Sequence, residues 1–174
     1  MKASIMLGDK EIVIAATLKA MVLYKRQFGE EYLDSFTEIN ESDSTEKQAE
    51  DITITGFRLL WAMVAAADDS TPLPNKWLAE RGSVKENFTT ALTEAQALFY
   101  TSIRSKKPGE SSSEKRVRIT TEQFLSAALK AGIGYNDALE MTIGELNAVL
   151  EEYIRPPKKK ENVRMATQAD FDRF

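Results

Sequence analysis

The chain has 174 residues, 43% hydrophobic and 29% charged, an ordinary balance for one globular domain or two small ones. Its net charge of −4 is too small to predict a polyanionic partner. Cys and His are both absent, which excludes disulfides, His or Cys metal sites, Cys nucleophiles and Ser-His-Asp triads. The longest apolar run, residues 59–67, is far short of the roughly 20 residues that cross a membrane, and no signal-peptide core follows residue 1. We therefore expect a cytoplasmic protein without cofactors.

The first fifteen or so residues predict a β-hairpin. Apolar residues alternate with polar or exposed positions on both sides of a short turn at residues 8–10, Gly-Asp-Lys. The residues expected on the inner face are Ala3, Ile5, Leu7, Ile12 and Ile14.

Helical periodicity follows the hairpin. Thr17 is placed to cap a first helix that Gly29 ends, and a further turn or two is expected around Tyr32. After a polar, acidic loop, a longer helix is expected from about Thr45 to Ala67, although residues 52–55 alternate like a strand. The residues expected on the buried faces of these two helices are Leu18, Met21, Val22, Phe28, Ile52, Phe57, Leu60, Trp61 and Val64.

Two more helices are expected before residue 104. Pro74 or Asn75 starts a short one that stops at Gly82, and Ser83 caps the next. Their apolar positions are Trp77, Leu78, Phe88, Leu92, Ala95, Phe99 and Ile103. Residues 1–103 thus predict a helical domain with an N-terminal hairpin.

Residues 104–118 predict a flexible basic linker. They carry six Lys or Arg against two Glu, and residues 104–116 include no large apolar side chain that could be buried. The charge favours solubility over nucleic-acid binding, because no aromatic residue stands among the basic ones to stack on bases. We expect limited proteolysis to cut here first and to leave a cooperative fragment of residues 1–103.

Residues 119–174 predict a helical extension with a polar tail. Thr120 with Gln123, and Thr142 with Glu145, fit capping boxes at the starts of two helices, the second of which stops at residues 155–157, Arg-Pro-Pro. Only about 40 residues would be structured, so we expect the extension to pack on the first region or on a partner. The whole chain is therefore expected to be mainly α: an N-terminal β-hairpin, a small helical bundle, and a short helical C-terminal extension.

No pattern in the chain predicts catalysis. Adjacent carboxylates diverge on a helix, and glycosidase-type chemistry needs two that converge. These adjacent pairs are Glu30 with Glu31, Asp68 with Asp69, and Glu151 with Glu152. Residues 132–134, Gly-Ile-Gly, predict a turn rather than a phosphate-binding loop. We expect no enzyme activity, no metal and no cofactor.

A family resemblance lies in residues 131–146, Ala-Gly-Ile-Gly-Tyr-Asn-Asp-Ala-Leu-Glu-Met-Thr-Ile-Gly-Glu-Leu. This segment resembles the extension of tail assembly chaperones from long-tailed bacteriophages, where a short helix leads into Met-Thr or Leu-Thr and then Glu-Leu. Residues 166–174 are similar to ends found in that family, and the hairpin with residues 20–30 resembles the start of its shorter form. The resemblance implies binding to the tape measure protein, which stays soluble while tail tube subunits polymerise around it.

The family is often produced as a short form and a frameshifted, extended form with a common N-terminus. The resemblance therefore implies a frameshift near Lys106 and Lys107, because paired Lys codons can supply a slippery A-rich run. A coding sequence without such a run between residues 100 and 118 would contradict this expectation.

Partner binding is expected in both regions. The N-terminal region holds both Trp residues, whose helical, apolar surroundings favour a place in the core over a role as a ligand platform. We expect the helices of this region to leave an apolar groove for a tape measure helix. The second region is expected to recruit tube subunits. The candidate partner-binding residues are Trp61, Trp77, Thr142, Glu145, Leu146 and Leu150. The alternative function is a non-enzymatic adaptor or regulatory protein, for instance one that binds nucleic acid. A helix with a basic face would favour this alternative, and none is found outside the linker. Self-association remains a further option.

Overall fold

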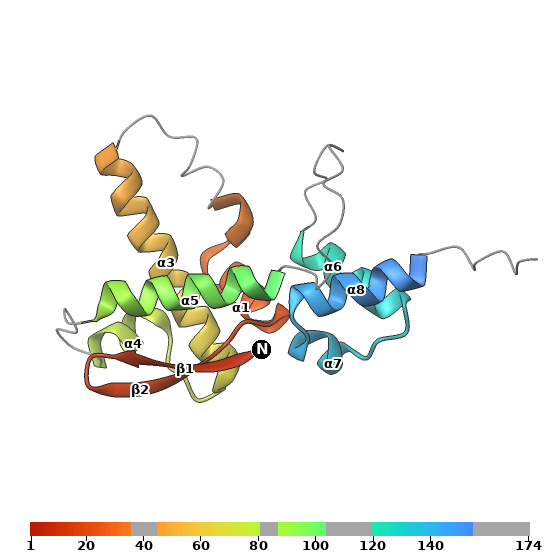
Figure 1. The fold of residues 1–174 in the computed structure, drawn as a ribbon, viewed down its shortest axis with the longest axis horizontal. Coiled ribbons are helices and arrows are strands. Elements are labelled where there is room, and N and C mark those ends of the chain that lie inside the picture. Colours follow the sequence, from red (N-terminus) through yellow and green to blue (C-terminus); the bar gives the residue numbers. More distant parts are fainter. Residues whose placement is uncertain (36–44, 81–86, 104–119, 155–174) are drawn as a thin grey trace, which may run out of the picture.

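The computed structural model describes residues 1–35, 45–80, 87–103 and 120–154 (Figure 1). The mainly α fold with an N-terminal hairpin is confirmed. The strands are β1 (Lys2–Leu7) and β2 (Lys10–Ala15), and a short helical stretch lies at residues 32–35. The longer helices are α1 (Leu18–Phe28), α3 (Thr45–Ala67), α4 (Pro74–Glu80), α5 (Phe88–Ile103), α6 (Thr121–Lys130), α7 (Tyr135–Glu140) and α8 (Ile143–Ile154).

The hairpin is antiparallel, with Leu7 paired to Lys10 and Lys2 paired to Ala15. Lys10 therefore belongs to β2, and the turn has two residues. Gly8 takes a positive φ of 66° at the first of them, where type II′ hairpin turns place glycine. The predicted alternation is confirmed in burial. The residues buried on the inner face are Ile5, Leu7, Ile12 and Ile14.

Helix α1 begins after Thr17 and ends at Gly29. Thr17 stands at the N-cap position, but its side chain makes no capping hydrogen bond, so this part of the prediction is wrong. The hydroxyl is buried, and the N–H of Leu18 instead donates to the carbonyl of Met141, 2.8 Å away. Gly29 has a φ of 78° and donates its N–H to the Lys25 carbonyl, which is the left-handed cap expected of glycine.

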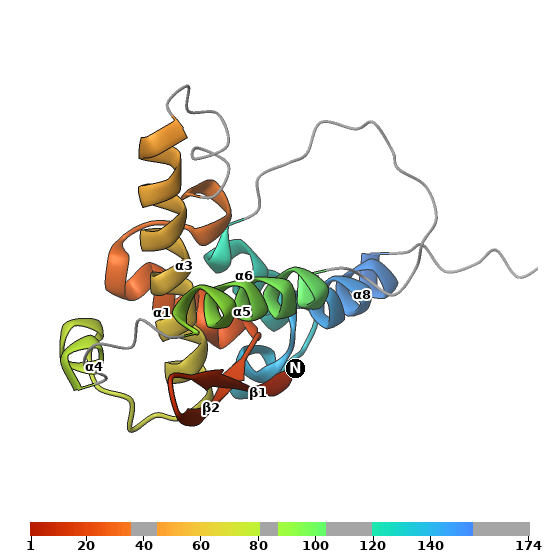
Figure 2. The same cartoon turned by 60° about the vertical axis from the view of Figure 1, so that its left-hand side comes forward.

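Helix α3 has two different halves. Residues 59–66 are all buried, whereas Ile52 is 42% exposed, and its predicted place on the core side is wrong. The reason is visible in Figures 1 and 2, where the N-terminal part of α3 extends beyond the other helices. The strand-like alternation at residues 52–55 also lies within the helix, because tertiary context outweighs a four-residue pattern.

Helix α5 begins at Phe88, directly after Asn87, which has a positive φ of 64°. The expected stop at Gly82 and cap at Ser83 lie outside the described residues. Gly56 of α3 lies close to α5, because a Cβ built on it would meet the Leu92 side chain at 3.5 Å.

Aromatic rings join these helices through edge-to-face contacts. The Tyr32 ring lies 4.9 Å from Phe99 of α5 and 5.5 Å from Tyr24 of α1, between ring centroids. Tyr24 in turn lies 5.1 Å from Phe28, which is 5.7 Å from Trp61 of α3. Such pairs contribute about 0.5–1.5 kcal/mol each beyond their buried area, so they fix the relative placement of the helices.

Residues 120–154 form α6, α7 and α8, which pack on α1 and α5. Both predicted capping boxes are present: Gln123 caps with Thr120 at α6, and the Thr142 N–H donates to Glu145 over 2.9 Å at α8. Phe124, Ile143 and Leu146 are buried in the same core as the N-terminal helices. The expected packing against the first region is thus found, whereas the linker and tail lie outside the described residues.

A polar cluster fastens α6 to the N-terminal region. The Glu31 carboxylate accepts hydrogen bonds from Lys25 at 2.7 Å, from the Thr121 N–H at 3.2 Å and from the Thr121 hydroxyl. Lys25 also binds Glu122 and lowers the pKa of that carboxyl. In turn, Glu122 and Glu31 together raise the pKa of Lys25. Because Thr121 is the first residue of α6, the Glu31 charge also faces a helix N-terminus.

Candidate functional site

The predicted partner-binding residues divide into core residues and capping residues. Trp61, Trp77 and Leu146 are 4%, 2% and 0% exposed, so in this fold they pack the core. Thr142 and Glu145 close the N-terminus of α8 on each other, with Thr142 buried. Leu150 is partly buried against the core. Together the six residues do not form a continuous exposed surface. Their direct contact with a partner stays a prediction.

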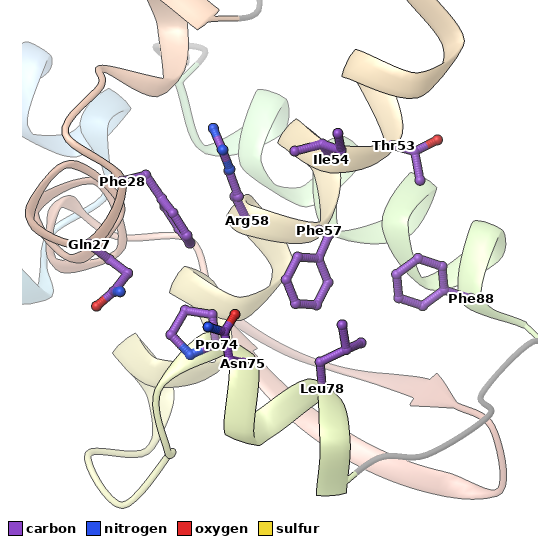
Figure 3. A pocket seen from close by; sticks show the side chains of 10 residues that line it. All are labelled: Gln27, Phe28, Thr53, Ile54, Phe57, Arg58, Pro74, Asn75, Leu78 and Phe88. Carbon is purple, nitrogen blue, oxygen red and sulfur yellow. The ribbon is translucent and has the colours of Figure 1, made fainter.

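An apolar groove opens instead between α1, α3, α4 and the start of α5. Its volume is about 600 Å³. In Figure 3 the Phe57, Leu78 and Phe88 side chains point toward one another across it. The residues that line it are Gln27, Phe28, Thr53, Ile54, Phe57, Arg58, Pro74, Asn75, Leu78 and Phe88.

Helix periodicity places two exposed aliphatic side chains on opposite walls of the groove. Ile54 of α3 is 40% exposed and Leu78 of α4 is 51% exposed. Successive helical residues point about 100° apart. Trp77 is buried in the core, and Leu78, the next residue, points in a different direction and lines the groove. An exposed leucine is unremarkable alone, but two aliphatics beside three aromatic rings make a continuous apolar surface.

The aromatic floor of the groove is held from below. The Phe57 ring lies 5.8 Å from Trp77 and 6.4 Å from Phe88, between centroids. Trp61 supports Phe28 and anchors the connection to α4, since its indole N–H donates to the Pro72 carbonyl over 2.9 Å. Neither Trp lines the groove, but each supports from the core side an aromatic residue that does: Trp61 supports Phe28, and Trp77 supports Phe57.

One wall carries the positive charge of the groove. The Arg58 guanidinium lies 5.1 Å above the Phe28 ring, a cation–π geometry, and binds the Glu30 carboxylate at 3.3 Å. The other polar lining groups are the neutral side chains of Gln27, Thr53 and Asn75. Because Glu30 already pairs with Arg58, the surface suits apolar side chains with a neutral polar flank.

Trp61 and Trp77, which the sequence suggested as partner-binding residues, do not line this groove, and their direct contact with a partner stays a prediction. Trp61 and Trp77 attracted attention because Trp is the largest ring, although size alone favours burial. The available signal was the pair Trp77-Leu78, since a short helix on the surface of a domain covers the core with one face only and neighbouring residues point about 100° apart. Ile52 with Ile54 gave a similar signal at the start of α3.

Apart from Arg58, the side chains that line the groove are uncharged. Within the described residues no group of three acidic side chains could hold a metal ion, and no helix is long and apolar enough to cross a membrane. Burial raises the pKa of Tyr24 and Tyr32, which lie in the core beside the groove rather than in its lining. The arrangement can bind apolar side chains.

Comparisons with protein-family models, with curated proteins and with solved structures give no match for this chain. Functional inference therefore depends on the groove, on the docking of α6–α8 and on the residue-level resemblance.

Proposed function

We propose that this chain is a tail assembly chaperone of a long-tailed bacteriophage, which binds the tape measure protein and helps to recruit tail tube subunits in the host cytoplasm. The proposal includes no catalytic step. The observation that carries it is the apolar groove between α3 and α4, with Ile54 and Leu78 exposed on its walls. The resemblance of residues 131–146 to the chaperone extension supports the choice of partner.

The size of the groove limits what it holds. A helix with its side chains is about 10–12 Å wide, so a cavity of about 600 Å³ takes a few side chains from one face rather than a whole helix. Amphipathic helices present such anchors at positions i, i+3 or i+4, and i+7. A tape measure helix would insert two or three large apolar side chains beside Phe57 and Leu78.

The proposed second partner would use α8. Its outward side carries Val149 and Tyr153, which are 40% and 62% exposed and stand four residues apart. Leu146, three and seven residues before them on the same stripe of the helix, is fully buried and fastens α8 to the core. Tube subunits would therefore meet an apolar pair on the C-terminal half of α8, beyond the buried Leu146 that holds the helix in place.

The test is co-expression and pull-down of the full chain with a tape measure protein and with tube subunits. Leu78→Asp should abolish tape measure binding, because it places a charge in the groove. Leu73→Asp is the matched control: Leu73 is 66% exposed and does not line the groove, so binding should persist. Equal binding by both variants would reject the groove, and failure of the wild type to bind either partner would reject the chaperone function.

A second variant tests the proposed role of α8. Replacing Val149 and Tyr153 by Ser should remove tube binding and leave tape measure binding unchanged. The reverse pattern would show that the two regions have exchanged roles. A tape measure gene directly downstream of the coding sequence would add independent support.

A further inference from the structure

The charge of the apolar groove depends on one side chain. Among the described residues that line it, Arg58 is the one that carries a charge. The Arg58 side chain is 32% exposed, and its guanidinium lies 5.1 Å from the centroid of the Phe28 ring. In Figure 3 it runs beside Phe28, on the side of the groove away from Leu78. A ligand in the groove would meet this cation, so the group that neutralises Arg58 decides which charge the ligand can carry.

Glu30 supplies the neutralising charge. Its Oε2 atom accepts a hydrogen bond from Nη1 of Arg58 over 3.3 Å and another from Oγ of Ser35 over 3.1 Å. Two donors on one oxygen hold the carboxylate beside the guanidinium. Glu30 does not line the groove, and its side chain is 55% exposed, so it acts on the groove through Arg58 rather than by filling space.

The turn that carries Glu30 is held in place by side-chain contacts. It leaves α1 at Gly29, where an added Cβ would meet nothing within 4 Å, so close packing does not fix the turn at that point. The carboxylate of the next residue, Glu31, accepts from the Thr121 N–H of α6 over 3.2 Å, and its carbonyl accepts from the Ser35 N–H over 3.1 Å. Glu30 is therefore positioned against Arg58 before any ligand arrives.

We propose that Glu30 is a specificity-determining residue of the groove: by neutralising Arg58 it admits apolar ligands with a neutral polar flank and disfavours ligands with an anionic one. The inference rests on the proposed function, in which the groove binds apolar side chains of a partner. An anionic group beside Arg58 would have to displace the Glu30 carboxylate or lie next to it with the same charge, and like charges in contact suppress the wrong partner. A tape measure helix would accordingly carry Asn, Gln, Ser or Thr beside its anchors rather than Asp or Glu.

Two dyes of nearly the same shape test this selectivity in the full chain. N-phenyl-1-naphthylamine is neutral, and 8-anilinonaphthalene-1-sulfonate has the same rings with one sulfonate added. The groove, of about 600 Å³, is in the size range of sites that hold such molecules. Glu30→Gln keeps the size of the side chain and leaves Arg58 without its counter-charge. Fluorescence titration should show that this variant binds the anionic dye about 3–10-fold more tightly and the neutral dye within about twofold of wild type.

Three further variants serve as controls. Asp69→Asn makes the same change in net charge and releases Lys19 from an ion pair of 2.8 Å, but it lies eleven residues from Arg58, roughly 16 Å at the rise of a helix. It should change the affinity for neither dye. Glu30→Gln combined with Arg58→Gln should lose the gain, because no cation remains in the groove. Leu78→Asp should weaken binding of both dyes, which places them in the groove.

Four results would overturn the proposal. They are an equal gain in Asp69→Asn, a gain that persists without Arg58, dye binding that Leu78→Asp leaves unchanged, and a wild type that binds the anionic dye as tightly as Glu30→Gln does. The titration contains no tape measure protein, so its failure is distinct from a failure of the chaperone function, which the pull-down alone decides.

Discussion

Replacement of Glu31 should reveal how the α6–α8 segment is fastened to the N-terminal helices. The Glu31 side chain is only 13% exposed and accepts hydrogen bonds from Lys25 and from two groups of Thr121. Hydrogen bonds to charged groups contribute roughly 1.5–3 kcal/mol each, and water replaces part of this when a donor is near the surface. Glu31→Ala should therefore lower the free energy of unfolding by about 2–4 kcal/mol.

Glu31→Gln separates charge from shape. The amide oxygen can still accept from Thr121, but the attraction to Lys25 and to the start of α6 is lost, so we expect a loss of about 1–2 kcal/mol. Urea unfolding followed by Trp fluorescence measures both variants, since Trp61 and Trp77 are buried in the folded state. Hydrogen exchange at residues 121–124 should accelerate more than exchange within α3.

Glu122→Ala is the control for this reasoning. Glu122 binds the same Lys25, but its side chain is 64% exposed, and exposed ion pairs contribute little. Its loss should be clearly smaller than that of Glu31→Ala. Equal losses would refute the claim that burial and the contact with Thr121 make Glu31 the main fastener.

Two further outcomes follow from the same structure. Leu146→Ala should lower the free energy of unfolding by about 2–5 kcal/mol, because a fully buried side chain is truncated. Val149→Ala, at a position of the same helix that is 40% exposed, should lower it by less than about 1 kcal/mol, and urea midpoints measure both. The hydrogen bond from Lys25 lowers the pKa of Glu122, so the ionised carboxylate stabilises the folded state above the unfolded pKa near 4.5. This stabilisation is lost as the pH falls through the lower pKa of the folded state. The difference in free energy of unfolding between wild type and Glu122→Gln should therefore shrink in acid.

Local patterns predicted the local structure well. The hairpin followed from alternation around Gly8, and the two capping boxes followed from a threonine three residues before Gln123 or Glu145. Gly29 was predictable as a helix end because only a residue without a side chain adopts its φ of 78° at little cost. In each case the interacting groups lie within a few residues of one another.

Contacts between distant segments were not predictable from the same patterns. Thr17 looks like an N-cap, yet the Leu18 N–H finds its acceptor at Met141, more than a hundred residues later. Glu31 belongs to a pair of adjacent carboxylates for which the sequence indicated no common partner, and ninety residues separate it from its Thr121 donor. Such pairings depend on how helices pack, and a single sequence contains no record of that packing.

The apolar groove illustrates the same division between local and tertiary structure. The short helix α4 places Trp77 and Leu78 next to each other, and neighbouring helical residues point about 100° apart. Burial of Trp77 against Phe57 therefore directs Leu78 outward, and the placement of α3 decides that it faces Ile54 and Phe88 rather than open solvent. Leu78→Asp is consequently a sharper probe of the groove than any change at Trp77, because it alters the exposed wall and leaves the core contact between Trp77 and Phe57 in place.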